Sequence, residues 1–163
     1  MGETTLIGLF LIFAAVVGLS DLRDRRIPNW LVIVGLATAL FGRAWFGGVG
    51  ALGSGVLGML ISAAMVLPIY RFRGMAAGDV KAIGAAGAFV GWPFAPLATI
   101  FVLVAGGACA LVGLAICRFK GLGLSEAMKK RMPYGVAIAL GLGCFSWWQL
   151  QSAPGKGFWV FAV

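Results

Sequence analysis

The sequence predicts an all-α membrane protein, a polytopic bundle of about six transmembrane helices. The first observation is composition, because 61% of the 163 residues are hydrophobic and only 11% are charged. The mean hydropathy of +1.02 lies far outside the range of a soluble domain. The second observation is that apolar residues form several runs, separated by short polar breaks, near the roughly 20 residues that a membrane helix needs. A single membrane-embedded domain over residues 1–163 is therefore expected.

The apolar runs also order the helices along the chain. The first run follows Glu3 and lacks the basic leading region of a secretory signal, so it is expected to remain as the first span. The second begins after Pro28, a residue suited to the first turn of a helix. The fourth, between Asp79 and Pro93, is short, so the number of spans is five or six. The expected helices cover residues 4–20, 29–46, 49–70, 79–92, 94–117 and 134–150.

Basic residues are concentrated at alternate breaks between these helices. The positive-inside rule places those breaks in the cytoplasm and both termini outside it, with Arg43 and Lys156 as exceptions. The net charge of +8 does not indicate nucleic-acid binding, because the basic residues flank membrane spans, where anionic lipid headgroups are the expected partners. The residues at the three breaks are Arg23, Arg25, Arg26; Arg71, Arg73, Lys81; and Arg118, Lys120, Lys129, Lys130, Arg131.

Small residues recur at every fourth position in the third expected helix: Gly50, Ser54, Gly58 and Ser62. This spacing lets another helix backbone approach closely, so it indicates tight packing rather than chemistry. The chain contains no histidine. That absence excludes Ser-His and Cys-His nucleophiles and HExxH metal sites, so neither a metal nor a cofactor is expected.

Only five acidic residues remain as candidates for chemistry: Glu3, Asp21, Asp24, Asp79 and Glu126. Asp21 follows the first apolar run and Asp79 opens the fourth, so both are expected at the same cytoplasmic depth. Carboxylates near the membrane interior are costly and often mark function, although an interfacial Asp paired with an arginine would be purely structural. From the residues alone, the two interpretations are balanced for this pair. Asp24, Glu126 and Glu3 are assigned structural or terminal roles.

Three stretches around these acids resemble the type IV prepilin peptidases, a family of GxGD-type intramembrane aspartic peptidases. The resemblance implies that Asp21 and Asp79 are the catalytic aspartates. It departs from the family pattern at Ala76, which replaces the first glycine of GxGD and raises the question of loop geometry. The stretches are Ser20-Asp21-Leu22-Arg23 with Arg26-Ile27-Pro28-Asn29-Trp30, Ala77-Gly78-Asp79-Val80-Lys81, and Met132-Pro133-Tyr134-Gly135-Val136-Ala137-Ile138-Ala139.

The same resemblance implies a substrate and a location. The substrate would be a prepilin-like precursor, with a short basic leader before an apolar helix, cut near the cytoplasmic face of the inner membrane. The chain resembles the short form that serves Flp or tight-adherence pili. Asp21 and Asp79 would share a proton, one acting as base and one as acid. The supporting positions are Gly78, Lys81, Pro28, Asn29, Pro133, Tyr134 and Gly135.

Two other functions fit parts of the sequence. A small transporter coupled to protons or cations could use Asp21 and Asp79 to carry charge, although no internal repeat supports it. A non-catalytic scaffold subunit would need only the small-residue packing and would leave the two acids unexplained. The sequence contains no indication of oligomeric state.

Overall fold

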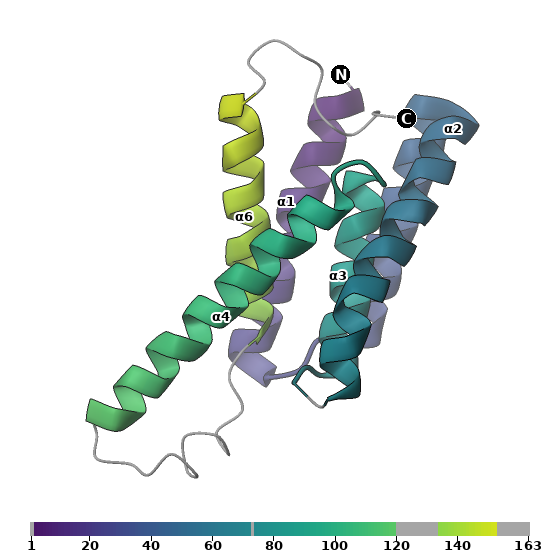
Figure 1. Cartoon of the computed structure of the whole chain (residues 1–163). Coiled ribbons are helices and arrows are strands. Elements are labelled where there is room, and N and C mark those ends of the chain that lie inside the picture. The colour runs from purple at the N-terminus through teal and green to yellow at the C-terminus, as the bar shows by residue number, and fades with distance from the viewer. Residues whose placement is uncertain (1, 73, 120–133, 153–163) are drawn as a thin grey trace.

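The computed structural model describes residues 2–72, 74–119 and 134–152 of the chain, with the side chains of residues 2 and 3 excepted. Glu126 and Pro133, both named from the sequence, lie outside these residues. The described part is a bundle of helices (Figure 1), as the sequence predicts. Its helices are α1 (Gly2–Asp24), α2 (Asn29–Arg71), α3 (Ala77–Val90), α4 (Ala95–Phe119) and α6 (Tyr134–Ser152).

Helix α2 is a hairpin of two limbs rather than one straight rod. Its 43 residues would extend for about 65 Å, twice the thickness of a bilayer core. The chain instead turns at Gly48, where φ is 70° and ψ is −165°, a conformation open essentially only to glycine. Residues 29–47 form the first limb and residues 49–71 the second, as Figure 1 shows. The two limbs correspond to the second and third predicted helices.

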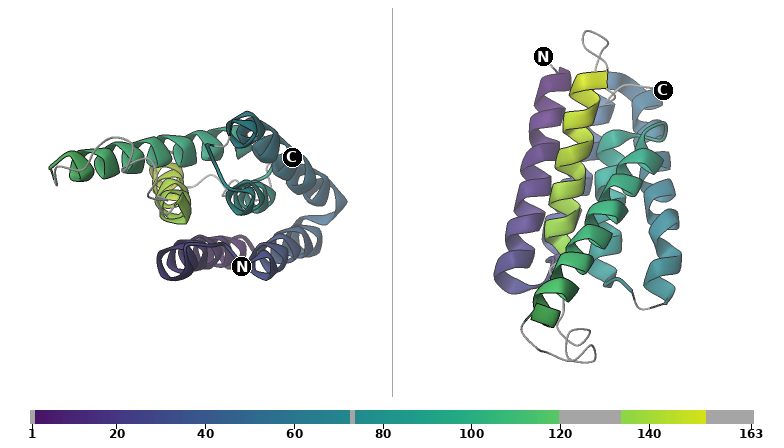
Figure 2. Two further views of the ribbon diagram at one scale, coloured as in Figure 1. Left: turned by 90° about the horizontal axis from the view of Figure 1, so that it is seen from below. Right: turned by 60° about the vertical axis from the view of Figure 1, so that its left-hand side comes forward.

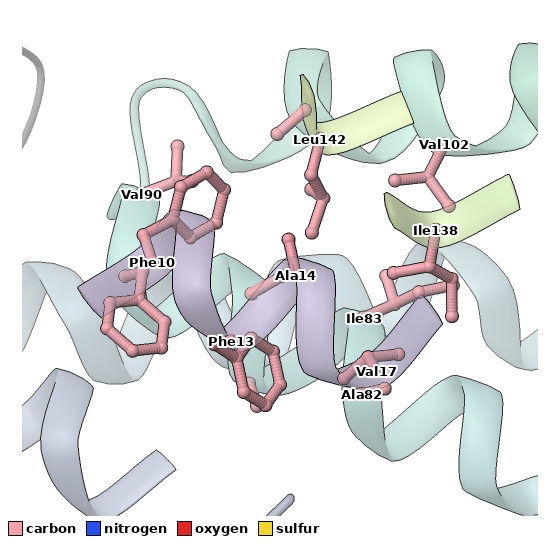
Figure 3. Close-up of a cluster of buried hydrophobic side chains, with 14 of the residues drawn as sticks. Phe10, Phe13, Ala14, Val17, Ala82, Ile83, Val90, Val102, Ile138 and Leu142 are labelled. Carbon is pink, nitrogen blue, oxygen red and sulfur yellow. The ribbon is translucent and has the colours of Figure 1, made fainter. Parts of the chain in front are cut away.

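Helix α3 is the central element of the bundle. Viewed along the bundle axis in Figure 2, it lies inside a ring made by α1, the two limbs of α2, α4 and α6. Every residue from Ala82 to Val90 is buried. Side chains of α1, α3, α4 and α6 meet in the apolar cluster of Figure 3, which includes Phe10, Ile83 and Leu142. A small, apolar helix such as α3 fits there because alanine and glycine allow close contact on every side.

The tightest contact of α3 is with the second limb of α2. A methyl group added at Gly58 would collide with the carbonyl oxygen of Gly87 and lie 2.9 Å from the Cα atom of Gly91. Ser54, Gly58 and Ser62 of the predicted small-residue spacing therefore lie at a helix–helix contact, whereas Gly50 is exposed.

Replacing Gly58 by alanine is expected to lower the free energy of unfolding by about 1–3 kcal/mol, because the added methyl must force α2 and α3 apart. Gly53→Ala is the matched control, since the same limb has nothing within 4 Å of a methyl at Gly53. Thermal unfolding in detergent would compare the two variants. Equal stability of the two would contradict this account of the contact.

The remaining helices surround α3 unequally. Helix α4 has its buried residues only in its first half, which ends at Gly106, and its second half diverges from the bundle (Figures 1 and 2). Among the residues that the structure describes, three stretches are long and apolar enough to cross a membrane: Thr4–Asp24, Asn29–Arg71 and Ala95–Phe119. The protein is accordingly a helical membrane protein, and the number of crossings stays a prediction.

The last turns of α1, α2 and α4, at one end of the bundle (the bottom of Figure 1), each carry an arginine: Arg23, Arg71 and Arg118. We call this end the basic end. The alternate breaks of the sequence therefore meet in space.

Two helix boundaries differ from the prediction in ways that affect the acids. Helix α1 continues to Asp24 instead of ending at residue 20, so Asp21 lies within its last turns. Helix α3 covers residues 77–90 instead of 79–92, so Asp79 lies in its first turn rather than at its first residue. The shift of α3 by two residues is within the usual uncertainty of helix ends, whereas α1 is one turn longer than predicted.

Candidate active site

Asp21 is fixed by the first residues of α6. Its side chain is only 5% exposed, although it lies at the basic end of the bundle. The backbone N–H of Gly135 donates a hydrogen bond to Asp21 Oδ2 at 2.6 Å. Gly135 is the second residue of α6, where N–H groups have no partner within the helix and the helix dipole favours a negative charge. The start of α6 therefore holds a carboxylate carried by a helix more than 100 residues earlier in the chain.

Asp79 is held by the turn that opens α3. Its side chain is 7% exposed, and the backbone N–H of Ala76 donates to Asp79 Oδ2 at 3.1 Å. Ala76 caps the helix in an extended conformation, with φ of −81° and ψ of 155°. Any L-residue adopts that conformation, so alanine in place of the first motif glycine requires no left-handed backbone here.

The two carboxylates lie at the same end of the bundle, Asp21 in the last turns of α1 and Asp79 in the first turn of α3. Both are buried, whereas Asp24 of the same α1 helix is exposed. Within residues 2–72, 74–119 and 134–152, no lysine or arginine side chain bonds either carboxylate. Among the described arginines, none supports the structural alternative of an interfacial aspartate paired with an arginine.

The segment between α1 and α2 packs against the start of α3. Lys81 Nζ donates to Asn29 Oδ1 at 3.2 Å, which links the first turns of α3 and α2. Both side chains are exposed, so this bond contributes little to stability by itself. Pro28 caps α2 from an extended conformation. A methyl at Gly78 would lie 3.5 Å from the carbonyl oxygen of Ile27, in ordinary contact.

Tyr134, the first residue of α6, directly precedes Gly135, which bonds Asp21. Its ring covers Gly106 of α4 so closely that a methyl at Gly106 would lie 2.6 Å from the phenol oxygen. A phenol can both donate and accept a hydrogen bond, so Tyr134 adds a polar group to a site otherwise made of carboxylates and backbone N–H groups.

Sequence inspection did not single out Gly106, although the Tyr134 ring needs the space that this glycine leaves. Nothing local distinguishes it, because the chain has 26 glycines and most of them are compatible with helix packing. The described residues also contain no cluster of three or more His, Cys, Asp or Glu side chains that could hold a metal ion. The functional groups available for a reaction at this site are two buried carboxylates, one phenol and the backbone N–H groups at the starts of two helices.

A sequence model of the type IV leader peptidase family matches residues 8–111. This match covers more than half of the chain and includes Asp21 and Asp79, while Tyr134 and Gly135 lie beyond it. Neither the curated proteins nor the solved structures provide a match to the chain.

Proposed function

Because this chain belongs to the type IV leader peptidase family, we propose that it is an aspartic endopeptidase that removes the leader from a prepilin-like precursor. The observation that supports the proposal is that Asp21 and Asp79 are two buried carboxylates, carried by different helices to the same end of the bundle. Two close carboxylates share a proton at low cost, and such a pair can serve as base and acid at once. The pair titrates as a unit, so the proton is assigned to neither residue.

In the proposed reaction, the ionised carboxylate removes a proton from a water molecule, and the resulting hydroxide attacks the scissile carbonyl carbon. The protonated carboxyl donates a hydrogen bond to the carbonyl oxygen as negative charge develops there. The tetrahedral intermediate then collapses, the C–N bond breaks, and the leaving nitrogen takes a proton from the carboxyl that gained one from water. No covalent intermediate forms.

The backbone bonds of the two acids orient them for this work. Gly135 N–H and Ala76 N–H each hold the Oδ2 atom of one carboxylate, so each side chain keeps a defined rotation while its other oxygen can face water or substrate. Such orientation before the reaction accounts for much of the catalytic effect of a proton-transfer pair.

The position of the pair suggests which bond is cut. It lies at the basic end of an apolar bundle, and the positive-inside rule assigns that end to the cytoplasm. A precursor with a basic leader and an apolar helix would place its leader junction at this depth. Cleavage of an Flp-like prepilin at the cytoplasmic face of the inner membrane is therefore part of the proposal.

Cleavage by the purified protein in liposomes tests this function. A synthetic precursor with a basic leader and an apolar helix is expected to be cut once, at the junction, by the wild type and not by the Asp21→Asn, Asp79→Asn double variant. Mass spectrometry of the products would locate the cut. Uptake of protons by the liposomes without any cleavage would instead favour the alternative function, a small transporter coupled to protons or cations.

A further inference from the structure

Arg43 is a fully buried cation at the end of the bundle opposite the basic end. It lies in the first limb of α2, close to the bend at Gly48, and its guanidinium makes three hydrogen bonds. Nε donates to Ala51 O at 2.7 Å, Nη1 to Phe89 O at 3.0 Å and Nη2 to Ser54 Oγ at 3.0 Å. A single side chain therefore joins both limbs of α2 to the end of α3.

A buried charge is costly unless its surroundings compensate it. No carboxylate bonds Arg43 within the described residues, and the compensation comes instead from the end of α3. The carbonyl of Phe89 would bond the N–H of residue 93 in a longer helix, but residue 93 is proline, which has no N–H. Arg43 supplies the missing donor, and the negative end of the helix dipole stabilises its charge.

The length of α3 explains why this partner matters. Its 14 residues span about 21 Å, less than the roughly 30 Å of a bilayer core. One end of α3 therefore stops inside the protein, where unpaired carbonyls have no water to bond. Arg43 of the first limb of α2 bonds the Phe89 carbonyl at that end. The Trp92 N–H donates to Ser54 O of the second limb at 3.0 Å, so that end is attached to both limbs.

The residue that Arg43 bonds also sets the register between α3 and α1. The Phe89 ring lies 5.6 Å from the Phe10 ring and 5.7 Å from the Phe13 ring, measured between centroids. Phe10 and Phe13 appear with Val90 in Figure 3. The rise along α3 between Phe89 and Asp79 is about 15 Å. The rise along α1 from Phe10 or Phe13 to Asp21 is similar, about 12–17 Å. Because the two acids lie at similar distances from the contact of Phe89 with α1, they reach the same position along the bundle axis.

We propose that Arg43 is a positioning residue: by fixing the Phe89 end of α3 it sets the depth and rotation of that helix, and thereby places Asp79 opposite Asp21. The inference rests on the proposed role of the two aspartates as the catalytic pair. Arg43 touches neither substrate nor acid, and it acts entirely through α3.

Arg43→Lys tests the proposal, because lysine keeps the charge but cannot direct three donors toward Ala51, Ser54 and Phe89 at once. The kcat of precursor cleavage is expected to fall about 10–10²-fold per folded molecule, the effect of a displacement of about 1 Å at a reacting group. The KM is expected to stay unchanged, because Arg43 contacts no substrate. Thr99→Val is the control: it removes the hydrogen bond from Thr99 to Ser62 between α4 and α2, so it should lower stability and leave kcat unchanged.

A distance measurement separates positioning from general destabilisation. Spin labels at Leu22→Cys and Ala77→Cys, both exposed positions beside the acids, would be introduced after replacing Cys109, Cys117 and Cys144 by alanine. Electron paramagnetic resonance is expected to show a shifted or broader distance distribution in Arg43→Lys than in the wild type or Thr99→Val.

Each outcome decides the matter. A loss of activity that only follows the folded fraction, with an unchanged distance distribution, would overturn the proposal. If Arg43→Lys does not insert, Ser54→Ala replaces it with the same two readouts, because it removes one acceptor of the guanidinium and keeps the charge. If the wild type cuts no precursor, the proposed function fails, and the distance measurement alone still shows whether Arg43 sets the spacing of the two helix ends.

Discussion

Asp21→Asn and Asp79→Asn are each expected to lower kcat/KM for precursor cleavage by about 10⁴-fold, the upper end of what general acid–base catalysis contributes. Asparagine keeps the shape of the side chain, and its amide oxygen can still accept the N–H of Gly135 or Ala76. It cannot take a proton from water or return one to the leaving nitrogen. Initial rates of cleavage in liposomes, normalised to inserted protein, would measure the effect.

The matched control is Asp24→Asn, which removes the same charge from the same helix, α1. Asp24 is exposed at the basic end, so this variant should cut at nearly the wild-type rate. Because Asp21 and Asp79 act as a unit, the double variant should be little worse than either single variant. Undiminished cleavage by either single variant would show that the proposed pair is wrong, and equal losses in all three single variants would indicate a general effect of charge at this end.

Much of the architecture could be predicted because a membrane restricts the options to apolar helices. The runs of apolar residues predicted each described helix to within a few residues, including the two limbs of α2 as separate helices. The turn between them needs a left-handed residue, and Gly47-Gly48 is the uncharged break that separates the runs. The gathering of arginines at the basic end follows from the same alternation of breaks.

The details that hold the candidate site together could not be predicted, because they join residues far apart in the chain. The bond from Gly135 to Asp21 depends on how α6 meets α1, and no local pattern fixes that meeting. Helix α1 also continues past residue 20, where the apolar run ends, and carries Asp21 in its last turns. Arg43 was expected only as an exception to the charge pattern, although an arginine within an apolar run is itself a signal of a buried partner.

The contact between α1 and α6 makes Gly135 the most sensitive position beside the acids. A methyl group at Gly135 would collide with the Cβ atom of Asp21 and lie 3.0 Å from both its carboxyl carbon and Oδ2. To accept an alanine, α6 must move away or Asp21 must rotate, and either change breaks the hydrogen bond to Oδ2. We expect Gly135→Ala to lower kcat by about 10²-fold, the cost of moving a reacting group by about 1 Å.

Gly143→Ala is the control that isolates this effect. It places the same methyl on the same helix at a position with nothing within 4 Å, and alanine stabilises a helix interior by about 0.5–1 kcal/mol relative to glycine. Gly143→Ala should therefore keep its activity and match or exceed the wild type in thermal stability. If Gly135→Ala cleaves as fast as Gly143→Ala, α6 does not hold Asp21 in place during catalysis. If Gly135→Ala alone loses kcat while both variants remain folded, the start of α6 is a working part of the site, even though it lies outside the residues that the family model matches.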